Sequence, residues 1–286
     1  MVKLVTDSAA NLPAPLAKQL DIVVVPLTVI FGEDSYREGI EITDEQFYNL
    51  LQTSQELPRT SQPSPNDFAA VFRRLLDAGH EVLCITLSKD LSGTYNSAVQ
   101  AAAMFEGAPL TVVDSRYVSA GEALLVVAAA RAIEAGANRE QAAALVETLS
   151  PHVLLLFTLD TLEYLKRGGR IGGASAFLGT MLRIKPVLQI RDGRVEPFDR
   201  VRRRQRALER MAEAAADRFG GQPVWVGLAH AEAEEDFHLL RDLLKQRLNV
   251  EYMLETKVGP VVGTHGGPGV IGMAVMPAPN FPKALE

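Results

Sequence analysis

The sequence predicts an α/β protein with two domains. A chain of 286 residues is long for one compact core and comfortable for two. In the first half, strand-like runs alternate with helical patterns, which is typical of βαβ units on a parallel sheet. In the second half, residues 185–198 resemble a hairpin around Asp192-Gly193, so the second sheet should be mixed. We place the boundary near Pro151, between an N-terminal domain of residues 1–150 and a C-terminal domain of residues 151–286.

The elements of the first half follow from short patterns. Residues 3–8 and 21–32 are strand-like, and Pro26 predicts a bend or an edge position within the second run. Thr43 and Gln46 have the spacing of a capping box that begins a helix. Further strands are expected at residues 81–88 and 109–115, and further helices at 90–107 and 121–136.

The loop Pro58–Pro65, "PRTSQPSP", is stiff because proline fixes its own φ and restrains the preceding residue. Ser64 is expected as the N-cap and Pro65 as the first residue of a helix that ends before Gly79. The hydroxyls of Thr60 and Ser61 would lie just upstream of this helix N-terminus, where free N–H groups favour an anion.

The second half contains fewer repeated patterns. Residues 152–173 pass from a strand to a short helix and a glycine-rich turn. Amphipathic helices are expected from about Asp199 to Phe219 and around residues 237–248. The remaining strands are expected at residues 223–231, 250–259 and 270–276.

Two residues lie where a ligand would bind. Ser92 in "LSGTYNSA" follows a predicted strand and begins a helix, which is the carboxyl end of a parallel sheet. Alternatively, Ser92 only caps that helix. His265 in "GTHGGPG" has glycines around it that let a ligand approach, although glycines also serve a tight turn.

Basic residues form two further candidates. Arg170 in "KRGGRIGG" lies between glycines, as either a ligand-binding residue or part of a solvated basic turn. The cluster "RVRRRQR", residues 200–206, is either a solvated helix face or a docking site for an acidic partner.

Composition excludes several classes of function. The net charge of −6 and the pI near 5.5 argue against general nucleic-acid binding. A single cysteine, Cys84, excludes an intrachain disulfide framework and a cysteine-based zinc site, and fits a reducing compartment. We expect no signal peptide, and the longest apolar run is broken by Arg131. The expectation is a soluble cytoplasmic protein with no membrane span and no metal.

Seven motifs occur together along the chain: "VTDSAANLP", "PRTSQPSP", "LSGTYNSA", "VVDS", "LEYLKRGGRIGG", "KPVL…DG" and "THGGPGVIG". In order and spacing this set resembles the DegV family, which includes the fatty-acid-binding subunit of bacterial fatty acid kinase. The resemblance spans nearly the whole chain. It implies a two-domain α/β fold that holds one long-chain fatty acid, of about C16–C18, between the domains.

The resemblance also implies a role for each candidate residue. Thr60, Ser92 and a suitably protonated His265 resemble the residues that hold the fatty-acid carboxylate. Arg170 resembles the arginine that supports the acyl phosphate made by the partner kinase. Arg202, the second arginine of "RVRRR", resembles the residue that docks the kinase.

The function expected from these residues is that of a lipid carrier, with no catalytic residue and no cofactor of its own. It would present its fatty acid to the ATP-binding subunit of the kinase, and the acyl phosphate would feed phospholipid synthesis. The protein alone is expected to be a monomer. Two alternatives stay open: a serine-type acyl hydrolase that uses Ser92 and His265, and a regulatory module that responds to lipid.

Overall fold

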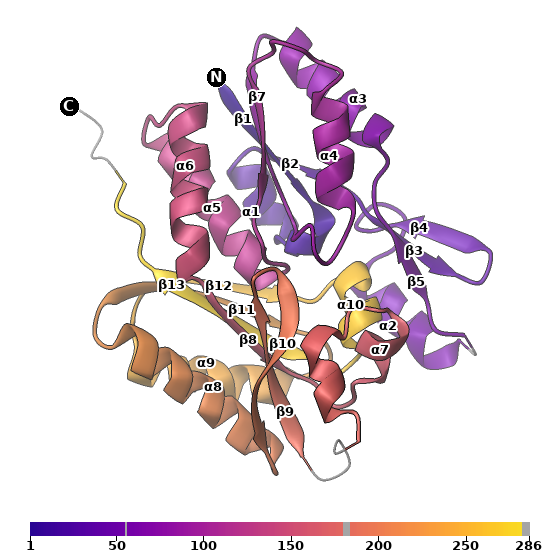
Figure 1. The fold of residues 1–286 in the computed structure, drawn as a ribbon, viewed down its shortest axis with the longest axis vertical. Helices are drawn as coiled ribbons and strands as arrows, with labels where there is room; N and C mark the ends of the chain where they lie inside the picture. Colours follow the sequence, from indigo (N-terminus) through magenta and orange to yellow (C-terminus); the bar gives the residue numbers. More distant parts are fainter. Residues whose placement is uncertain (55, 180–183, 282–286) are drawn as a thin grey trace.

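The computed structural model describes residues 1–54, 56–179 and 184–281 (Figure 1). In the first half, four parallel strands form a sheet in the order β2-β1-β6-β7. These strands are β1 (Val2–Asp7), β2 (Ile22–Val25), β6 (Glu81–Thr86) and β7 (Leu110–Asp114). The predicted parallel sheet is confirmed.

Helices cover both faces of this sheet. Side chains that alternate along β1 and β6 belong to two different cores, as the two-residue period of a strand requires. Val5, Val82 and Cys84 pack with α3 (Pro65–Asp77) and α4 (Thr94–Ala102). Leu4, Leu83 and Ile85 pack in the core that contains α5 (Ala120–Glu134) and α6 (Arg139–Leu149). The short helix α1 (Ala14–Gln19) adds Ala17 to that second core.

The second half forms a six-stranded mixed sheet in the order β10-β9-β8-β13-β11-β12. Only β11 and β12 pair in parallel within this order. The strands are β8 (Leu154–Thr158), β9 (Lys185–Arg191), β10 (Arg194–Val201), β11 (Pro223–His230), β12 (Asn249–Lys257) and β13 (Ile271–Pro277). The hairpin predicted at Asp192-Gly193 joins β9 to β10 and is confirmed.

The six-stranded sheet is covered by α8 (Arg204–Phe219) and α9 (Glu234–Arg247) on one face and by α5 on the other (Figure 1). The backbones of α5 and β11 approach closely, because a Cβ at Gly227 would lie 3.0 Å from the carbonyl oxygen of Ala120. Helix α5 therefore packs against both sheets, and one continuous core joins the two halves. The boundary at residue 150 stays a prediction.

A small antiparallel sheet completes the fold, in the order β4-β3-β5. Its strands are β3 (Thr28–Phe31), β4 (Asp34–Arg37) and β5 (Arg59–Ser61), and α2 (Asp44–Thr53) lies between β4 and β5 in the chain. The bend predicted at Pro26 is confirmed, since β2 ends at Val25 and the chain leaves for this second sheet. The C-terminal helix α10 (Pro260–Gly266) packs against β3, β5 and α2.

Local capping signals predicted two helix starts correctly. Thr43 with Gln46 begins α2, and Ser64 with Asp67 begins α3, each as a complete capping box. No helix within the described residues is long and apolar enough to cross a membrane. The short helix predicted within residues 152–173 is α7 (Glu163–Arg167), followed by a 3₁₀ segment at Gly172–Phe177.

One prediction in the second half was wrong. The helix expected from Asp199 begins at Arg204 instead, because Asp199 to Val201 continue β10 beyond a bulge and pair with β9. The glycine-rich segment around His265 is helical. Glycine is unfavourable in the interior of a helix. A larger residue would not fit at Gly263, however, because a Cβ there would lie 2.5 Å from the Tyr48 hydroxyl oxygen. Close packing, which no local pattern reveals, sets the residue type there.

A buried carboxyl group links α10 to the first half of the chain. Glu38 is 7 % exposed; it accepts hydrogen bonds from the Ser8 hydroxyl and from the backbone N–H of Val261, at the first turn of α10. Burial raises the pKa of Glu38 to about 8, and nearby Asp44 and Asp7 add to the effect. The group is therefore largely protonated at neutral pH.

Glu38 should make the protein less stable as the pH rises. Its folded pKa exceeds the ordinary value of 4.5, so its contribution is complete below pH 4.5 and is lost by about pH 8. At about 1.4 kcal/mol per pKa unit, the free energy of unfolding should fall by on the order of 4 kcal/mol over this range. Denaturant titrations from pH 5 to pH 8 should show a flatter profile for Glu38→Gln. The control Glu41→Gln, an exposed carboxylate nearby, should keep the wild-type slope; a wild-type slope in Glu38→Gln would contradict this assignment.

Candidate functional site

A cavity of about 290 Å³ lies where the two halves and the small sheet meet. Its polar residues come from five segments that are far apart in the sequence: Thr60, Ser61, Gln62, Ser92, Ser119, Arg170 and His265. The rest of the wall is apolar and is formed by Ala9, Leu27, Leu87, Leu91, Val118, Ala120, Leu155, Phe157, Leu165, Ile190, Val195, Ala229, Val258, Val261, Val262, Val270 and Met273, together with glycines. Such an apolar cavity with a few convergent polar groups is typical of small-molecule sites.

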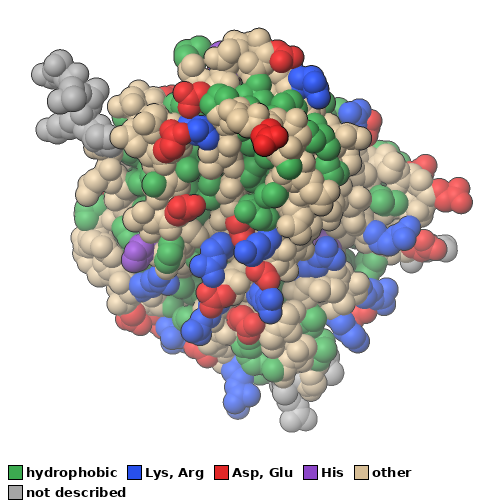
Figure 2. Space-filling view, turned by 45° about the horizontal axis from the view of Figure 1, so that its top comes forward, with side chains coloured by type: hydrophobic (Ala, Val, Ile, Leu, Met, Phe, Trp, Pro, Cys, Tyr) green, Lys and Arg blue, Asp and Glu red, His purple; other side chains and the backbone are tan. Residues whose placement is uncertain are grey.

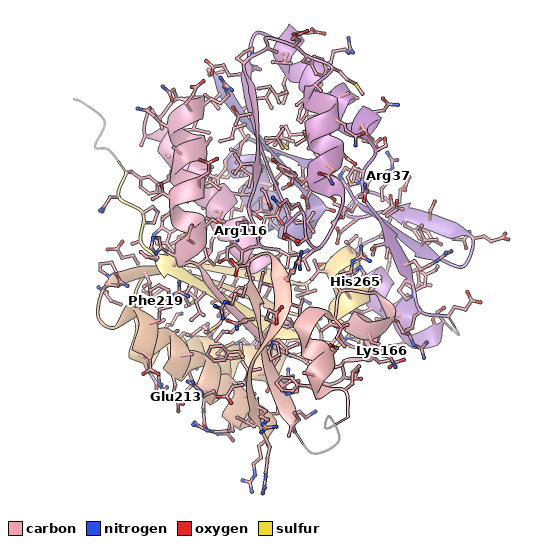
Figure 3. All side chains as sticks on the ribbon, viewed as in Figure 1. Arg37, Arg116, Lys166, Glu213, Phe219 and His265 are labelled. Atoms are coloured by element: carbon pink, nitrogen blue, oxygen red, sulfur yellow. The ribbon has the colours of Figure 1, made fainter. Side chains whose placement is uncertain are left out.

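The polar end of the cavity is built around a contact between Thr60 and His265. Thr60 lies on β5 and His265 on the last turn of α10, and the Thr60 Oγ1 atom is 2.9 Å from His265 Nε2. Figure 3 shows His265 at the side of the molecule where α10, α7 and the small sheet meet. The two residues are 205 positions apart, so only the packing of α10 on β5 brings them together.

The N-terminus of α3 is capped by its own side chains, and an anion at this helix end stays a prediction. The Ser64 hydroxyl accepts from the N–H of Asp67, and the Asp67 carboxylate accepts from the N–H and the hydroxyl of Ser64. That helix end is therefore already capped by an acidic side chain of its own. Two hydroxyl-bearing residues of the same loop, Thr60 and Ser61, line the cavity.

His265 is neutral in this structure. Burial lowers its pKa to about 4, and the positive charge of Arg170 adds to the effect. The ring atom Nδ1 is buried and has no hydrogen-bond partner among the described residues. With the proton on Nε2, the ring donates to Thr60 Oγ1, and the Thr60 hydroxyl proton is then free for a ligand.

Ser92 has a similar arrangement. It lies one residue before Gly93, the N-cap of α4, so it is not itself the cap. Its hydroxyl oxygen is 2.9 Å from that of Thr94, which is fully buried, and it accepts weakly from the Thr94 backbone N–H. When Thr94 donates its hydroxyl proton to Ser92, the Ser92 proton is free for a ligand in the cavity.

Glycines in the sequence motifs make room for polar side chains. A Cβ at Gly168 would overlap with His265 Nδ1, and a Cβ at Gly93 would overlap with the side-chain amide of Gln62. Gly267 has a φ of +74°, which favours glycine, and packs against the ring of Tyr164. The glycines of "LSG", "RGG" and "HGG" are thus packing positions around the cavity.

Arg170 is held in place by backbone oxygens. Its Nε atom donates to the carbonyl of Leu91 at 3.0 Å and its Nη1 atom donates to the carbonyl of Gly168 at 2.7 Å. No partner for Nη2 is found among the described residues, so one edge of the guanidinium is available to a ligand. Because both restraints are backbone groups, the side chain needs little further ordering on binding.

Arg202 lies outside this arrangement. It is exposed in the short connection between β10 and α8 and is not among the residues that line the cavity. Its neighbours Arg204, Arg206 and Arg210 pair with Asp236, Glu213 and Asp199, respectively. Figure 2 shows acidic and basic side chains interleaved over one face of the molecule, and no broad basic surface appears there.

Sequence reasoning missed three polar residues of this site. No sequence pattern indicated a role for these residues, which are Gln62, Thr94 and Ser119. They are notable in the sequence only because they lie near Thr60, near Ser92 and at the start of a helix. Gln62 Nε2 donates to Ser97 Oγ at 3.3 Å. Each of the three is recognised only by what the folded chain places beside it.

The geometry differs from that of a serine hydrolase. Ser92 contacts Thr94, whereas His265 contacts Thr60, and no carboxylate orients His265 through Nδ1. No group of three or more potential metal ligands is found in the part of the chain that the structure describes. The arrangement is instead suited to hold an acidic headgroup with hydroxyl donors while an apolar chain fills the rest.

Comparisons with known proteins identify the family of this chain. A family model described as "Uncharacterised protein, DegV family" matches residues 1–278. A DegV domain-containing protein of Streptomyces coelicolor is 38 % identical, covering 96 % of this chain and 98 % of its own.

Two solved structures are similar over nearly the whole chain. One is described as fatty acid binding of a DegV family protein from Thermus thermophilus, with 39 % identity and a TM-score of 0.92, covering 97 % of this chain and 99 % of the other. Another is a stearic-acid-binding protein from Eubacterium ventriosum, with 32 % identity and a TM-score of 0.88, covering 97 % and 98 %. The expected two-domain α/β fold is that of these proteins, and this chain belongs to the DegV family.

Proposed function

We propose that this protein binds one long-chain fatty acid in the cavity and presents its carboxyl group to a partner kinase. The observation that carries the proposal is the division of the cavity into a partly exposed polar end, with Thr60, Ser92, Arg170 and His265, and a buried apolar remainder. Similar proteins that bind fatty acids support it. In this reading the chain is a carrier, and the kinase performs the chemistry.

The carboxylate would be held by two hydroxyl donors. Thr60 and Ser92 each have a second polar group behind them, His265 and Thr94, that can fix the direction of the hydroxyl proton. Hydrogen bonds to a charged acceptor are stronger than those between neutral groups. A neutral His265 suits this role, because its proton stays on the ring and only orients Thr60.

The apolar chain would provide most of the affinity. About fourteen methylenes buried at ~0.8 kcal/mol each amount to roughly 11 kcal/mol before the costs of association. This gross gain is large enough to keep a fatty acid of about C16–C18 bound during purification. The polar end then determines the direction of the chain and contributes the smaller part of the affinity.

The kinase would act at the exposed polar end. Arg170 offers the free edge of its guanidinium beside the carboxyl site, where it would stabilise charge on the transferred phosphoryl group. Arg202 forms no ion pair with any residue that the structure describes, unlike Arg204 and Arg206, and is exposed for an acidic surface of the partner. We propose that the acyl phosphate made in this way feeds phospholipid synthesis in the cytoplasm, with the carrier itself a monomer.

The direct test is native mass spectrometry of the purified protein, followed by extraction and identification of the lipid. We expect one adduct with the mass of a C16 to C18 fatty acid, released on denaturation. A protein without an adduct that also takes up no added fatty acid would overturn the carrier proposal.

Removing one hydroxyl donor should weaken binding. In Thr60→Val the carboxylate loses a charge-assisted hydrogen bond, which corresponds to roughly a ten- to hundredfold increase in Kd. Ser92→Ala should have an effect of the same size. Fluorescent fatty-acid displacement with delipidated protein measures both. The control Thr53→Val removes an exposed hydroxyl that bonds only to its own helix and should leave Kd unchanged; an unchanged Kd in Thr60→Val would contradict the assignment.

The two arginines should separate binding from phosphorylation. Arg170→Ala should keep the fatty acid and abolish its ATP-dependent phosphorylation in the presence of the kinase subunit, because the charge beside the reacting group is lost. Arg202→Ala should weaken co-migration with the kinase and leave the lipid bound. Arg37→Ala, on β4, is the control that should change neither. Loss of the lipid in Arg170→Ala would make Arg170 a direct ligand instead.

A methyl group at Gly168 should displace the His265 ring. In Gly168→Ala the new Cβ overlaps with His265 Nδ1, so the ring must move and its contact with Thr60 is lost. We expect a loss of about 1–3 kcal/mol in the free energy of unfolding and weaker fatty-acid binding. Gly221→Ala, which meets no atom within 4 Å, should affect neither. Wild-type binding by Gly168→Ala would show that His265 does not orient Thr60.

A further inference from the structure

The cavity contains one polar side chain outside the cluster at its exposed end. Ser119 lies between β7 and α5, is 8 % exposed and lines the cavity, and its hydroxyl oxygen has no partner among the described residues. Its backbone is fully engaged, since its N–H donates to the Ala9 carbonyl and its own carbonyl accepts from the Ala123 N–H. Only the hydroxyl is left without a hydrogen bond.

The ordinary role of a serine at this position is to cap the helix, and Ser119 does not do so. The N-cap residues Thr43, Ser64 and Asn138 all have extended backbones and form complete capping boxes. Ser119, at the N-cap position of α5, has φ 53° and ψ −132° and makes no side-chain capping bond. This backbone conformation favours glycine, and retaining a serine there is unfavourable unless its hydroxyl contributes elsewhere.

Ser119 is more deeply buried than the four side chains that form the polar end of the cavity. Thr60, Ser92, Arg170 and His265 are all partly exposed, whereas Ser119 and its neighbour Ala120 are buried. Ala120 in turn packs against β11 at Gly227, on the inner face of the six-stranded sheet. A fatty acid with its carboxylate at the mouth would therefore lay part of its apolar chain beside this hydroxyl, and a plain chain would leave the hydroxyl unpaired.

We propose that Ser119 is a second polar contact of the cavity, which recognises long-chain fatty acids that carry a hydroxyl or keto oxygen within the buried part of the chain. This inference rests on the proposed function, since it requires the carboxylate to bind at the mouth. A serine hydroxyl both donates and accepts, so it fits either oxygen. The rest of the wall beside it is apolar, so the contact discriminates by the position of the oxygen along the chain.

The test compares plain and oxygenated acids in matched proteins. Delipidated wild type, Ser119→Ala and Ser119→Gly are titrated with stearic acid and with monohydroxystearic acids that differ in the position of the hydroxyl. We expect one hydroxyl position at which the hydroxy acid binds to the wild-type protein more tightly than stearic acid does. That advantage should fall roughly two- to tenfold in both variants, the equivalent of one neutral hydrogen bond. Ser119→Gly also removes the hydroxyl, and glycine tolerates the positive φ at this position. This variant therefore supplies a folded protein if Ser119→Ala is unstable.

One control variant and two possible outcomes distinguish this inference from the proposed function. Ser92→Ala should weaken the binding of all the acids by the same factor, because each of them has the same carboxylate. If every acid binds and the ratios are the same in wild type and in the Ser119 variants, the Ser119 contact is overturned while the carrier function stands. If neither stearic acid nor any hydroxy acid binds to wild type, both proposals are overturned.

Discussion

The site depends on the return of the C-terminal chain to the first half of the molecule. Helix α10 carries His265, and it is positioned by the Glu38 carboxyl group at its first turn and by Tyr48, whose hydroxyl donates to the Val258 carbonyl at 2.8 Å. Without this packing, Thr60 would have no partner and the cavity would be open on one side. Together with α5, which packs against both sheets, α10 joins the two halves of the chain.

Buried acids organise the other side of the cavity. Asp7 accepts hydrogen bonds from the backbone N–H groups of Ala9 and Leu87, two residues of the cavity wall. Burial raises its pKa to about 7, and burial also raises the pKa of neighbouring Glu122 well above its usual range. A carboxyl group whose pKa is raised by burial carries less negative charge near neutral pH, so it can hold loops through hydrogen bonds at a smaller desolvation cost.

The polar end of the cavity has a common design. The Thr60 and Ser92 hydroxyls each contact a second polar side chain, His265 and Thr94. Arg170 is held by backbone carbonyls, and Gly168 leaves space for the His265 ring. Such preorganisation reduces the entropy lost on binding. Ser119 differs, because its hydroxyl has no partner within the described parts of the chain, and our proposal of a second polar contact rests on this difference.

Much of the architecture was predictable from local patterns. The capping boxes at Thr43 and Ser64, the bend at Pro26 and the hairpin at Asp192 are short-range features, determined by residues a few positions apart, and the structure confirms each. The alternation of strands and helices predicted the parallel sheet for the same reason. The start of α8 was misplaced because strand pairing with β9 overrode a helical pattern at Asp199.

The motifs of the sequence predict Thr60, Ser92, Arg170 and His265 as site residues, and the structure brings all four to one cavity. Their contacts and charges depend on the folded chain. The neutral state of His265 follows from burial and from Arg170, and the pairing with Thr60 spans 205 residues. Likewise, no sequence pattern predicts that the Ser119 hydroxyl lacks a hydrogen-bond partner among the described residues. Desolvation and long-range packing arise only when the chain is folded.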